Sequence, residues 1–157
     1  MIAHGFVTTS DYDVVMATPV VSIRFSDPRH HQRLKAAAER ASTSVSALAE
    51  RLIEEGLRMA DHPQVIFRDG PAGRRPVLLA GPEVADVIGM LVGGDVPVDE
   101  RRGRAADLLD LSVAAVDAAL DYYADFTEEV DADLEARRTL ADELEDRWRR
   151  GQALLES

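Results

Sequence analysis

The chain of 157 residues is long enough for one ordinary domain or two small ones. It contains no cysteine, which excludes a disulfide framework and a thiolate metal site, and it has no apolar run of the length that spans a membrane. The first residues lack the basic start and long apolar core of a secretory signal. We therefore expect a cytoplasmic protein that begins with a loose arm over residues 1–18.

The net charge of −11 is unevenly distributed along the chain. Residues 20–60, which we call the head, contain seven basic and five acidic groups. The head is therefore mildly basic, and the remaining residues carry a net charge of −13. Phosphate repels the acidic remainder, so such a chain would meet DNA through its head only.

Residues 20–26 predict a half-buried strand. Val21, Ile23 and Phe25 alternate with Ser22 and Arg24, which is the period of two that a strand with one wet face shows. The strand has no pairing partner nearby, because two helices follow it. We expect it to pair with the same strand of a second copy, so that Ile23 and Phe25 are buried in a shared core and folding requires a dimer.

The two helices of the head are predicted from their caps and apolar spacing. Asp27-Pro28 supplies an N-cap and a proline at the first helical position, and the helix runs to about Ala41. The sequence Ser42-Thr43-Ser44 breaks this helix and offers a second N-cap. The apolar residues that follow at helical spacing should form a buried stripe: Val45, Leu48, Leu52, Ile53 and Leu57.

One strand followed by two helices at residues 19–60 resembles the ribbon-helix-helix family of DNA-binding proteins, the MetJ/Arc/CopG-like repressors and antitoxins. The resemblance implies a homodimer whose two-stranded ribbon enters the major groove of operator DNA. It also implies base reading and, at the start of the second helix, a phosphate clamp by these residues: Val20, Ser22, Arg24, Thr43, Ser44 and Val45. The alternative is an ordinary helix pair with an edge strand whose wet face holds Ser22 and Arg24.

Residues 61–126 predict a second unit after a hinge at Asp61-His62-Pro63. Residues 64–68 and 75–79 flank a glycine-rich turn and indicate a hairpin. Three helices follow, one from Gly81-Pro82 to Gly93-Gly94, one over residues 98–109, and one capped by Ser112. The apolar residues of the last helix are expected to be buried: Val113, Val116, Ala119, Leu120 and Tyr123.

This second unit has the outline of a small winged helix-turn-helix and resembles a domain of unknown function found in antitoxins of VapB type. The matching positions are His62-Pro63, Gly70-Pro71, Arg74-Arg75, Gly94 and the run from Leu111 to Tyr122. Residues 95–104 depart from that pattern, being longer and more charged. The arginines of the unit could contact phosphate or lie on a solvated face of a dimerisation or spacer module: Arg68, Arg74, Arg75, Arg101, Arg102 and Arg104.

Residues 127–157 predict an acidic helical tail with an apolar stripe. The stripe includes Leu134, Ala141, Leu144, Leu155 and the single tryptophan, Trp148, and it suggests a helix that is poorly ordered alone and binds in a partner's groove. The alternative is a helix folded back on the second unit. In antitoxins that the chain resembles, this segment neutralises a toxin, commonly a PIN-type ribonuclease. Arg147, Arg149 and Arg150 could then approach its acidic site.

No arrangement of catalytic or metal-ligating residues is apparent, so we expect neither an enzyme nor a cofactor. The expected architecture is mainly α with short β: a ribbon-helix-helix head, a small winged-helix-like domain and a helical tail. The expected function is that of an antitoxin in a type II toxin-antitoxin system that also represses its own operon. The alternative is a stand-alone repressor with no toxin partner.

Overall fold

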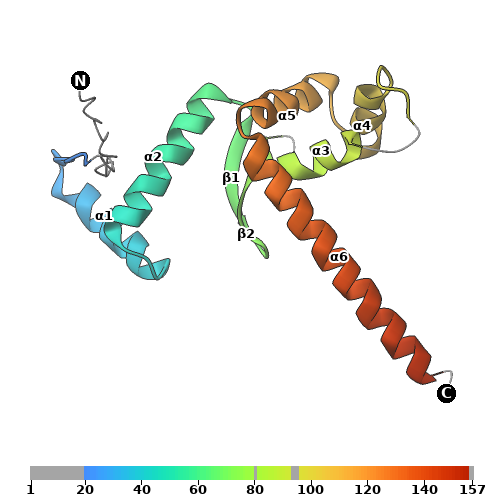
Figure 1. Cartoon of the computed structure of the whole chain (residues 1–157). Helices are drawn as coiled ribbons and strands as arrows, with labels where there is room; N and C mark the ends of the chain where they lie inside the picture. The colour runs from blue at the N-terminus through green and yellow to red at the C-terminus, as the bar shows by residue number, and fades with distance from the viewer. Residues whose placement is uncertain (1–19, 80, 93–95, 156–157) are drawn as a thin grey trace, which may run out of the picture.

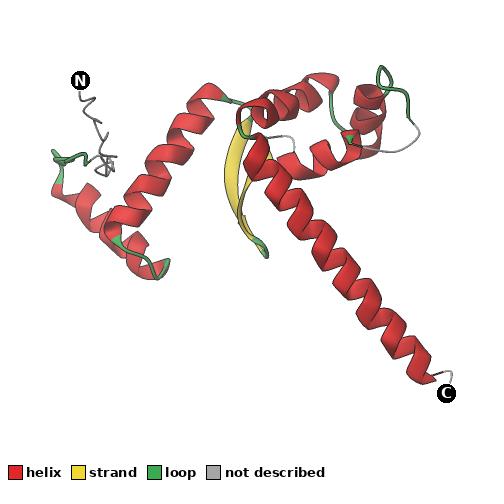
Figure 2. Ribbon diagram, in the orientation of Figure 1, coloured by secondary structure: helices red, strands yellow, loops and turns green. Residues whose placement is uncertain are grey.

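A computed structural model describes residues 20–79, 81–92 and 96–155; the expected arm over residues 1–18 lies outside this range. The described part consists of six helices and one hairpin, whose arrangement is drawn in Figures 1 and 2. The elements are α1 (Pro28–Arg40), α2 (Val45–Asp61), β1 (Val65–Gly70), β2 (Gly73–Leu78), α3 (Val84–Leu91), α4 (Arg101–Leu109), α5 (Val113–Asp125) and α6 (Thr127–Leu155). The expectation of a mainly helical chain with a small antiparallel sheet is confirmed.

Residues 20–26 do not form a strand in the single chain. The apolar residues expected on the buried face are open to solvent, with Ile23 53% and Phe25 36% exposed. The physical reason is that a strand is held by hydrogen bonds to a neighbouring strand, and the sheet in the described residues contains only β1 and β2. The predicted ribbon therefore stays a prediction about a dimer.

The caps of α1 and α2 are those that the sequence predicts. The Asp27 carboxylate accepts a hydrogen bond from the Arg29 N–H at 2.8 Å, and the Ser44 hydroxyl accepts one from the Ala47 N–H at 3.0 Å. Hydrogen bonding from Arg29 lowers the pKa of the Asp27 carboxyl. Ser42 adopts a left-handed conformation with φ of 50°, which ends α1 and turns the chain toward α2.

The helix pair of the head buries little in the single chain. Ala38 and Leu48 are buried where α1 and α2 meet. The expected burial of the rest of the α2 stripe is wrong for one chain, since Leu52, Ile53 and Leu57 are about half exposed. A pair of short helices buries only the side of each helix that faces the other. Burial of the rest of the stripe therefore requires a further surface.

The body is built on the hairpin and the helices that follow it. Strands β1 and β2 pair antiparallel from Val65 with Leu78 to Gly70 with Gly73, and Gly73 takes a φ of 96° in the turn. A contiguous core is formed by buried residues of β1, β2, α3, α4, α5 and the start of α6, the largest being Tyr122, Leu78, Ile88, Val65, Val84, Val87 and Val116.

Three expectations for the helices of the body are corrected. The aromatic residue that α5 buries is Tyr122, not Tyr123, whose hydroxyl instead donates a hydrogen bond to Asp131, and Val113 is half exposed. The buried face of α5 is thus rotated, because it packs against both α3 and α4. Helix α4 begins at Arg101 and not at residue 98, since Pro97 to Glu100 form a turn.

Helix α6 runs without a break for 29 residues. Its first turns pack on the body, where Val130 and Asp133 are buried, and the remainder projects away from it (Figure 1). Among the described helices, none has the combination of length and apolar character needed to cross a bilayer.

Candidate nucleic-acid interface and projecting helix

The residues predicted to read DNA bases lie on the exposed segment before α1. Val20, Ser22 and Arg24 are all open to solvent, and Arg24 takes part in no ion pair within the described residues. The predicted phosphate clamp, Thr43 to Val45, lies at the other end of α1. Thirteen helical residues, about 20 Å, separate the two groups along α1, so one chain does not bring them together.

The start of α2 nevertheless has the geometry of an anion site. The first backbone N–H groups of a helix have no intrahelical acceptor. At the start of α2, the Ser44 hydroxyl accepts a hydrogen bond from the N–H of Ala47. Thr43 and Val45 flank this cap, with Thr43 exposed and its N–H bonded to the carbonyl of Ala38. The hydrogen bonding therefore fixes the turn before α2, and the N–H groups at the very start of the helix have no intrahelical acceptor.

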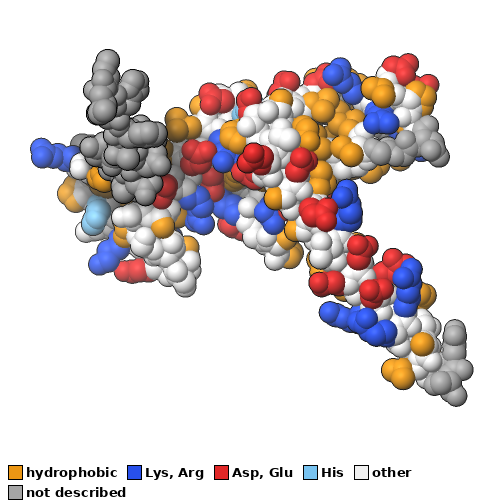
Figure 3. Space-filling view, in the orientation of Figure 1, with side chains coloured by type: hydrophobic (Ala, Val, Ile, Leu, Met, Phe, Trp, Pro, Cys, Tyr) orange, Lys and Arg blue, Asp and Glu red, His pale blue; other side chains and the backbone are white. Residues whose placement is uncertain are grey.

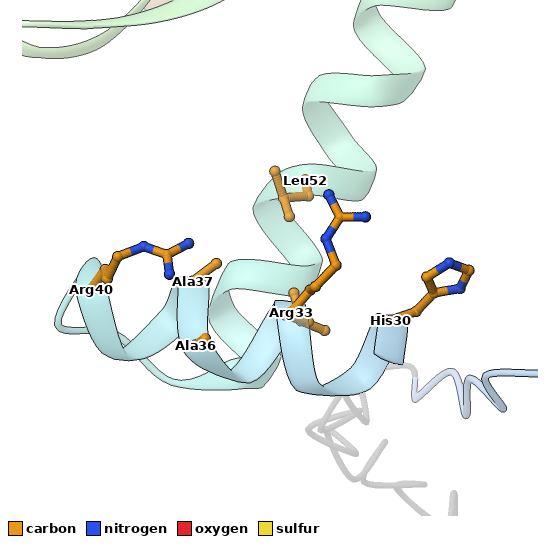
Figure 4. Close-up of a pocket in the computed structure, with 7 residues that line it drawn as sticks. His30, Arg33, Ala36, Ala37, Arg40 and Leu52 are labelled. Atoms are coloured by element: carbon orange, nitrogen blue, oxygen red, sulfur yellow. The ribbon is translucent and has the colours of Figure 1, made fainter. Parts of the chain in front are cut away.

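A basic groove between α1 and α2 was not singled out from the sequence. It has a volume of about 410 Å³, and Figure 4 shows Arg33, Arg40 and His30 of α1 beside the apolar Leu52 of α2. Leu34, Ala36 and Ala37 complete its lining. Cations around an apolar floor suit an acidic, amphipathic surface, and the bare apolar residues of α2 lie on the same helix pair.

The C-terminal half of α2 is fixed to the body by a buried ion pair. Both guanidinium nitrogens Nε and Nη2 of Arg74 on β2 donate to the Glu55 carboxylate, at 2.7 and 2.8 Å. The Glu55 side chain is only 7% exposed. This hydrogen-bonded carboxylate raises the pKa of Arg74.

A second contact joins α2 to the α5–α6 corner. Arg58 donates to the Glu129 carboxylate at 2.5 Å and to the Tyr122 hydroxyl at 3.1 Å, and its guanidinium lies 4.1 Å from the centre of the Phe126 ring. Burial raises the pKa of Tyr122 to about 12. His62 lies at the end of α2 with Nε2 3.1 Å from an Asp125 carboxylate oxygen.

These contacts span residues 61–63, where the sequence predicts a hinge. Ion pairs from α2 and the close approach of His62 to Asp125 connect α2 to the body, so α2 contacts α1 at its start and the body at its end. The hinge between the two units stays a prediction.

Most arginines of the body are committed to internal contacts. Arg74 binds Glu55, Arg75 lies 3.1 Å from Asp133, Arg101 donates to the carbonyls of Val96 and Leu91, and Arg102 lies 3.4 Å from Asp117. Of the six arginines considered for phosphate contact, only two are in no ion pair or internal hydrogen bond within the described ranges: Arg68 and Arg104.

The exposed face of α5 is acidic, with Asp121 and Asp125 open to solvent and Asp117 partly so. Phosphate would be repelled from this face, so the helix that would read DNA in a winged helix-turn-helix is unsuited to that task. The arrangement of charges favours the spacer or dimerisation interpretation of the second unit over a second DNA contact.

The start of α6 is clamped to the body, and this part includes Leu134, one of the residues predicted to bind a toxin. Arg137 pairs with Asp133 at 2.9 Å, with Asp86 at 2.7 Å and with Glu83. Leu134 is half-buried and packs against the core, within reach of Gly89. Leu134 therefore contributes to the fold, and its role in toxin binding stays a prediction.

The other residues predicted to bind a toxin lie on the projecting part of α6. Ala141, Leu144, Arg147, Trp148 and Leu155 are exposed, Trp148 to 64%. Figure 3 shows this part with acidic, basic and apolar side chains on its surface. The expectation that the tail is poorly ordered differs from the structure, in which its helix continues from the clamped turns and is supported by the ion pair from Arg149 to Glu145.

The described residues contain no group of three or more His, Asp or Glu side chains placed to hold a metal ion. Comparisons with known proteins do not assign the chain to a family: no family model matches it, and neither a curated protein nor a solved structure matches it significantly.

Proposed function

We propose that the protein is a dimeric, DNA-binding antitoxin that represses its own operon through its head and neutralises a toxin through α6. The observation that carries the proposal is the uncovered apolar surface of the head. Val21, Ile23 and Phe25 of the N-terminal segment are exposed, and so are Leu52 and Leu57 of α2. A surface of this kind in a head of about 40 residues is expected to be buried against a second copy.

Antiparallel pairing of the N-terminal segments of two chains as strands would bury this apolar surface. The apolar side chains would turn inward over the four helices, and Ser22 and Arg24 would line the outer face of the ribbon. Arg24 is a bidentate donor to the guanine edge in the major groove, and the start of α2 supplies backbone N–H groups for phosphate. The ribbon-helix-helix and winged-helix identities of the two units are part of this proposal.

The projecting part of α6 supports the antitoxin function over a repressor without a partner. It presents Leu144 and Trp148 on one face well beyond the body, where an exposed aromatic side chain can serve as an anchor for a partner protein. Arg147 and Arg150 take part in no ion pair within the described residues, so both remain able to contact carboxylates. A PIN-type ribonuclease, with its carboxylate site, is the class of toxin that fits.

The DNA-binding part is tested by gel-shift titration of the DNA upstream of the gene with the Arg24→Ala variant. Loss of a base-edge contact should weaken specific binding by about 1–3 kcal/mol, roughly 5- to 150-fold, with dimerisation unchanged. Arg138→Ala is the matched control, because it removes an exposed arginine of α6 that is not among the arginines considered for DNA contact. Equal effects of the two variants would contradict the docking of the ribbon.

The toxin-binding part is tested by co-purification from cells that express the native gene neighbourhood. A small nuclease should accompany the wild-type protein and be lost with Trp148→Ala, since a central aromatic anchor contributes about 2–4 kcal/mol. Leu108→Ala, a similarly exposed apolar residue on α4, should retain it. A nuclease that binds all three proteins equally would show that α6 is not its docking site.

A further inference from the structure

The projecting part of α6 has one apolar face that is bare along its whole length. Its residues follow one another at spacings of four, four, three and four, which keeps them within an arc of about 80° on a straight helix: Leu140, Leu144, Trp148, Gly151 and Leu155. We call this set the distal stripe. It continues the face of α6 that packs Val130 and Asp133 on the body. The helix thus leaves the body with its packing face uncovered.

The charges beside the distal stripe are separated into two blocks. Four acidic residues lie within positions 142–146, and three arginines lie within positions 147–150. On the helix, Glu143 and Arg150 fall along one edge of the stripe, and Glu145 and Arg149 along the other. Within the described residues Arg149 pairs with Glu145 and Asp146, whereas neither Glu143 nor Arg150 is in an ion pair. Arg147 lies on the same edge and is likewise in no ion pair within the described residues, so this edge carries one uncompensated negative charge and two uncompensated positive charges.

We propose that α6 pairs antiparallel with α6 of a second copy of this chain, through the distal stripe. A helix with an acidic block followed by a basic block complements itself only when its copy runs in the opposite direction. Placing Glu143 opposite Arg150 of the second copy also places Arg150 opposite Glu143, as a twofold axis requires. Parallel pairing would set like charges against each other and is disfavoured.

The same register gives the stripe a packed seam. With residues 143 and 150 opposed, Leu144 faces Trp148 of the second copy, and Ala141 faces the region of Gly151 and Gln152. A Cβ at Gly151 would meet no atom within 4 Å, so in the single chain this glycine leaves open space on the stripe. A small residue at this level lets the two backbones approach around the indole rings.

This inference does not depend on the proposed function, because it concerns the chain alone. If the toxin uses the same stripe, toxin binding and self-pairing exclude each other. The helix then alternates between a partner of its own kind and the nuclease, and free antitoxin shields its apolar stripe until toxin is present.

The experiment uses the absence of cysteine from the full chain. The double variant Ala141→Cys/Gln152→Cys has its two thiols about 16 Å apart on one helix, too far for a disulfide within the chain. Antiparallel pairing brings Cys at one position close to Cys at the other in the second copy. Under mild oxidation the double variant should form a covalent dimer on a denaturing gel, and neither single variant should do so.

A further substitution separates pairing through the stripe from random collision. Trp148→Ala in the double-cysteine background should weaken self-association about thirtyfold or more and abolish the cross-link, as expected for a central aromatic anchor. Leu108→Ala in the same background is the control and should leave the cross-link intact. Circular dichroism should show α6 still helical in both, because Trp148 makes no contact with the core.

Three outcomes would overturn the proposal. A covalent dimer of Ala141→Cys alone would indicate parallel pairing. No cross-link in the double variant at concentrations where the head dimerises would show that the stripe does not self-associate. A cross-link that survives Trp148→Ala would show that the contact does not use the stripe. Each of these leaves the toxin-binding test unaffected, so failure of this inference and failure of the proposed function are distinguishable.

Discussion

The buried pair between Glu55 and Arg74 provides the sharpest test of how the head is joined to the body. Glu55→Ala removes a carboxylate that accepts two hydrogen bonds and is 7% exposed. Breaking a buried ion pair costs about 3–5 kcal/mol when the remaining charge stays buried. The Arg74 side chain is 27% exposed and keeps Asp69 at 3.1 Å, so it can turn partly to water. We therefore expect a loss of about 2–3 kcal/mol in the free energy of unfolding.

Urea denaturation followed by circular dichroism measures this loss. Glu50→Ala is the control, since it removes an exposed carboxylate from the same helix and should change stability by about 0.5 kcal/mol or less. A double-mutant cycle with Arg74→Ala should give a coupling energy of at least about 1 kcal/mol. A coupling below about 0.5 kcal/mol would refute the view that this pair fixes α2 to the body.

Three further predictions follow from the head and from Tyr122. Phe25→Ala should convert the dimer to monomers at micromolar concentration in sedimentation experiments while leaving the body folded, because Phe25 is buried only if a second copy covers it; a stable dimer would place the interface elsewhere. Gly56→Ala should raise the free energy of unfolding of the monomer by about 1 kcal/mol, since nothing lies within 4 Å of the added methyl. The same substitution should weaken the dimer if α2 packs closely on α2 of the second copy, and an unchanged dimer would exclude that close approach. Tyr122 has a folded-state pKa of about 12 against 10.0 for an exposed phenol, so its contribution to stability is complete below pH 10 and is lost as the pH rises toward 12. In unfolding measured against pH, Tyr122→Phe should reduce this loss of stability at alkaline pH. An unchanged pH dependence would show that the phenol is not responsible.

Local structure in this chain could be predicted from the sequence because its signals are local. The caps by Asp27 and Ser44, the glycine turn of the hairpin and the start of α5 after Ser112 depend on contacts within four residues. Each was expected and each is present. The helical spacing that marks a buried stripe is also local, but which residue of a stripe is buried depends on where the neighbouring helices lie, and here Tyr122 replaced Tyr123.

The long-range polar contacts could not be predicted in the same way. Glu55 and Asp133 are buried carboxylates, whereas acidic residues are mostly exposed, and only the fold brings Arg74 and Arg75 to them. From the sequence, those two arginines could have contacted phosphate or lain on a solvated face. Leu134 matched the apolar spacing of the tail but packs on the core, because the body extends two turns further along α6 than the charge pattern indicates.

The clamp at Arg137 also sets how the protein can be degraded. Proteases act on locally unfolded chain, and the helix beyond Arg137 has no tertiary contacts with the core to resist opening, over about 27 Å. Digestion that begins at the C-terminus should proceed easily to the clamp and slow there, where opening also requires breaking contacts to Glu83 and Asp86. The product would contain the head and the body without the projecting part of α6. The projecting part of α6 would therefore have a shorter lifetime than the rest of the molecule.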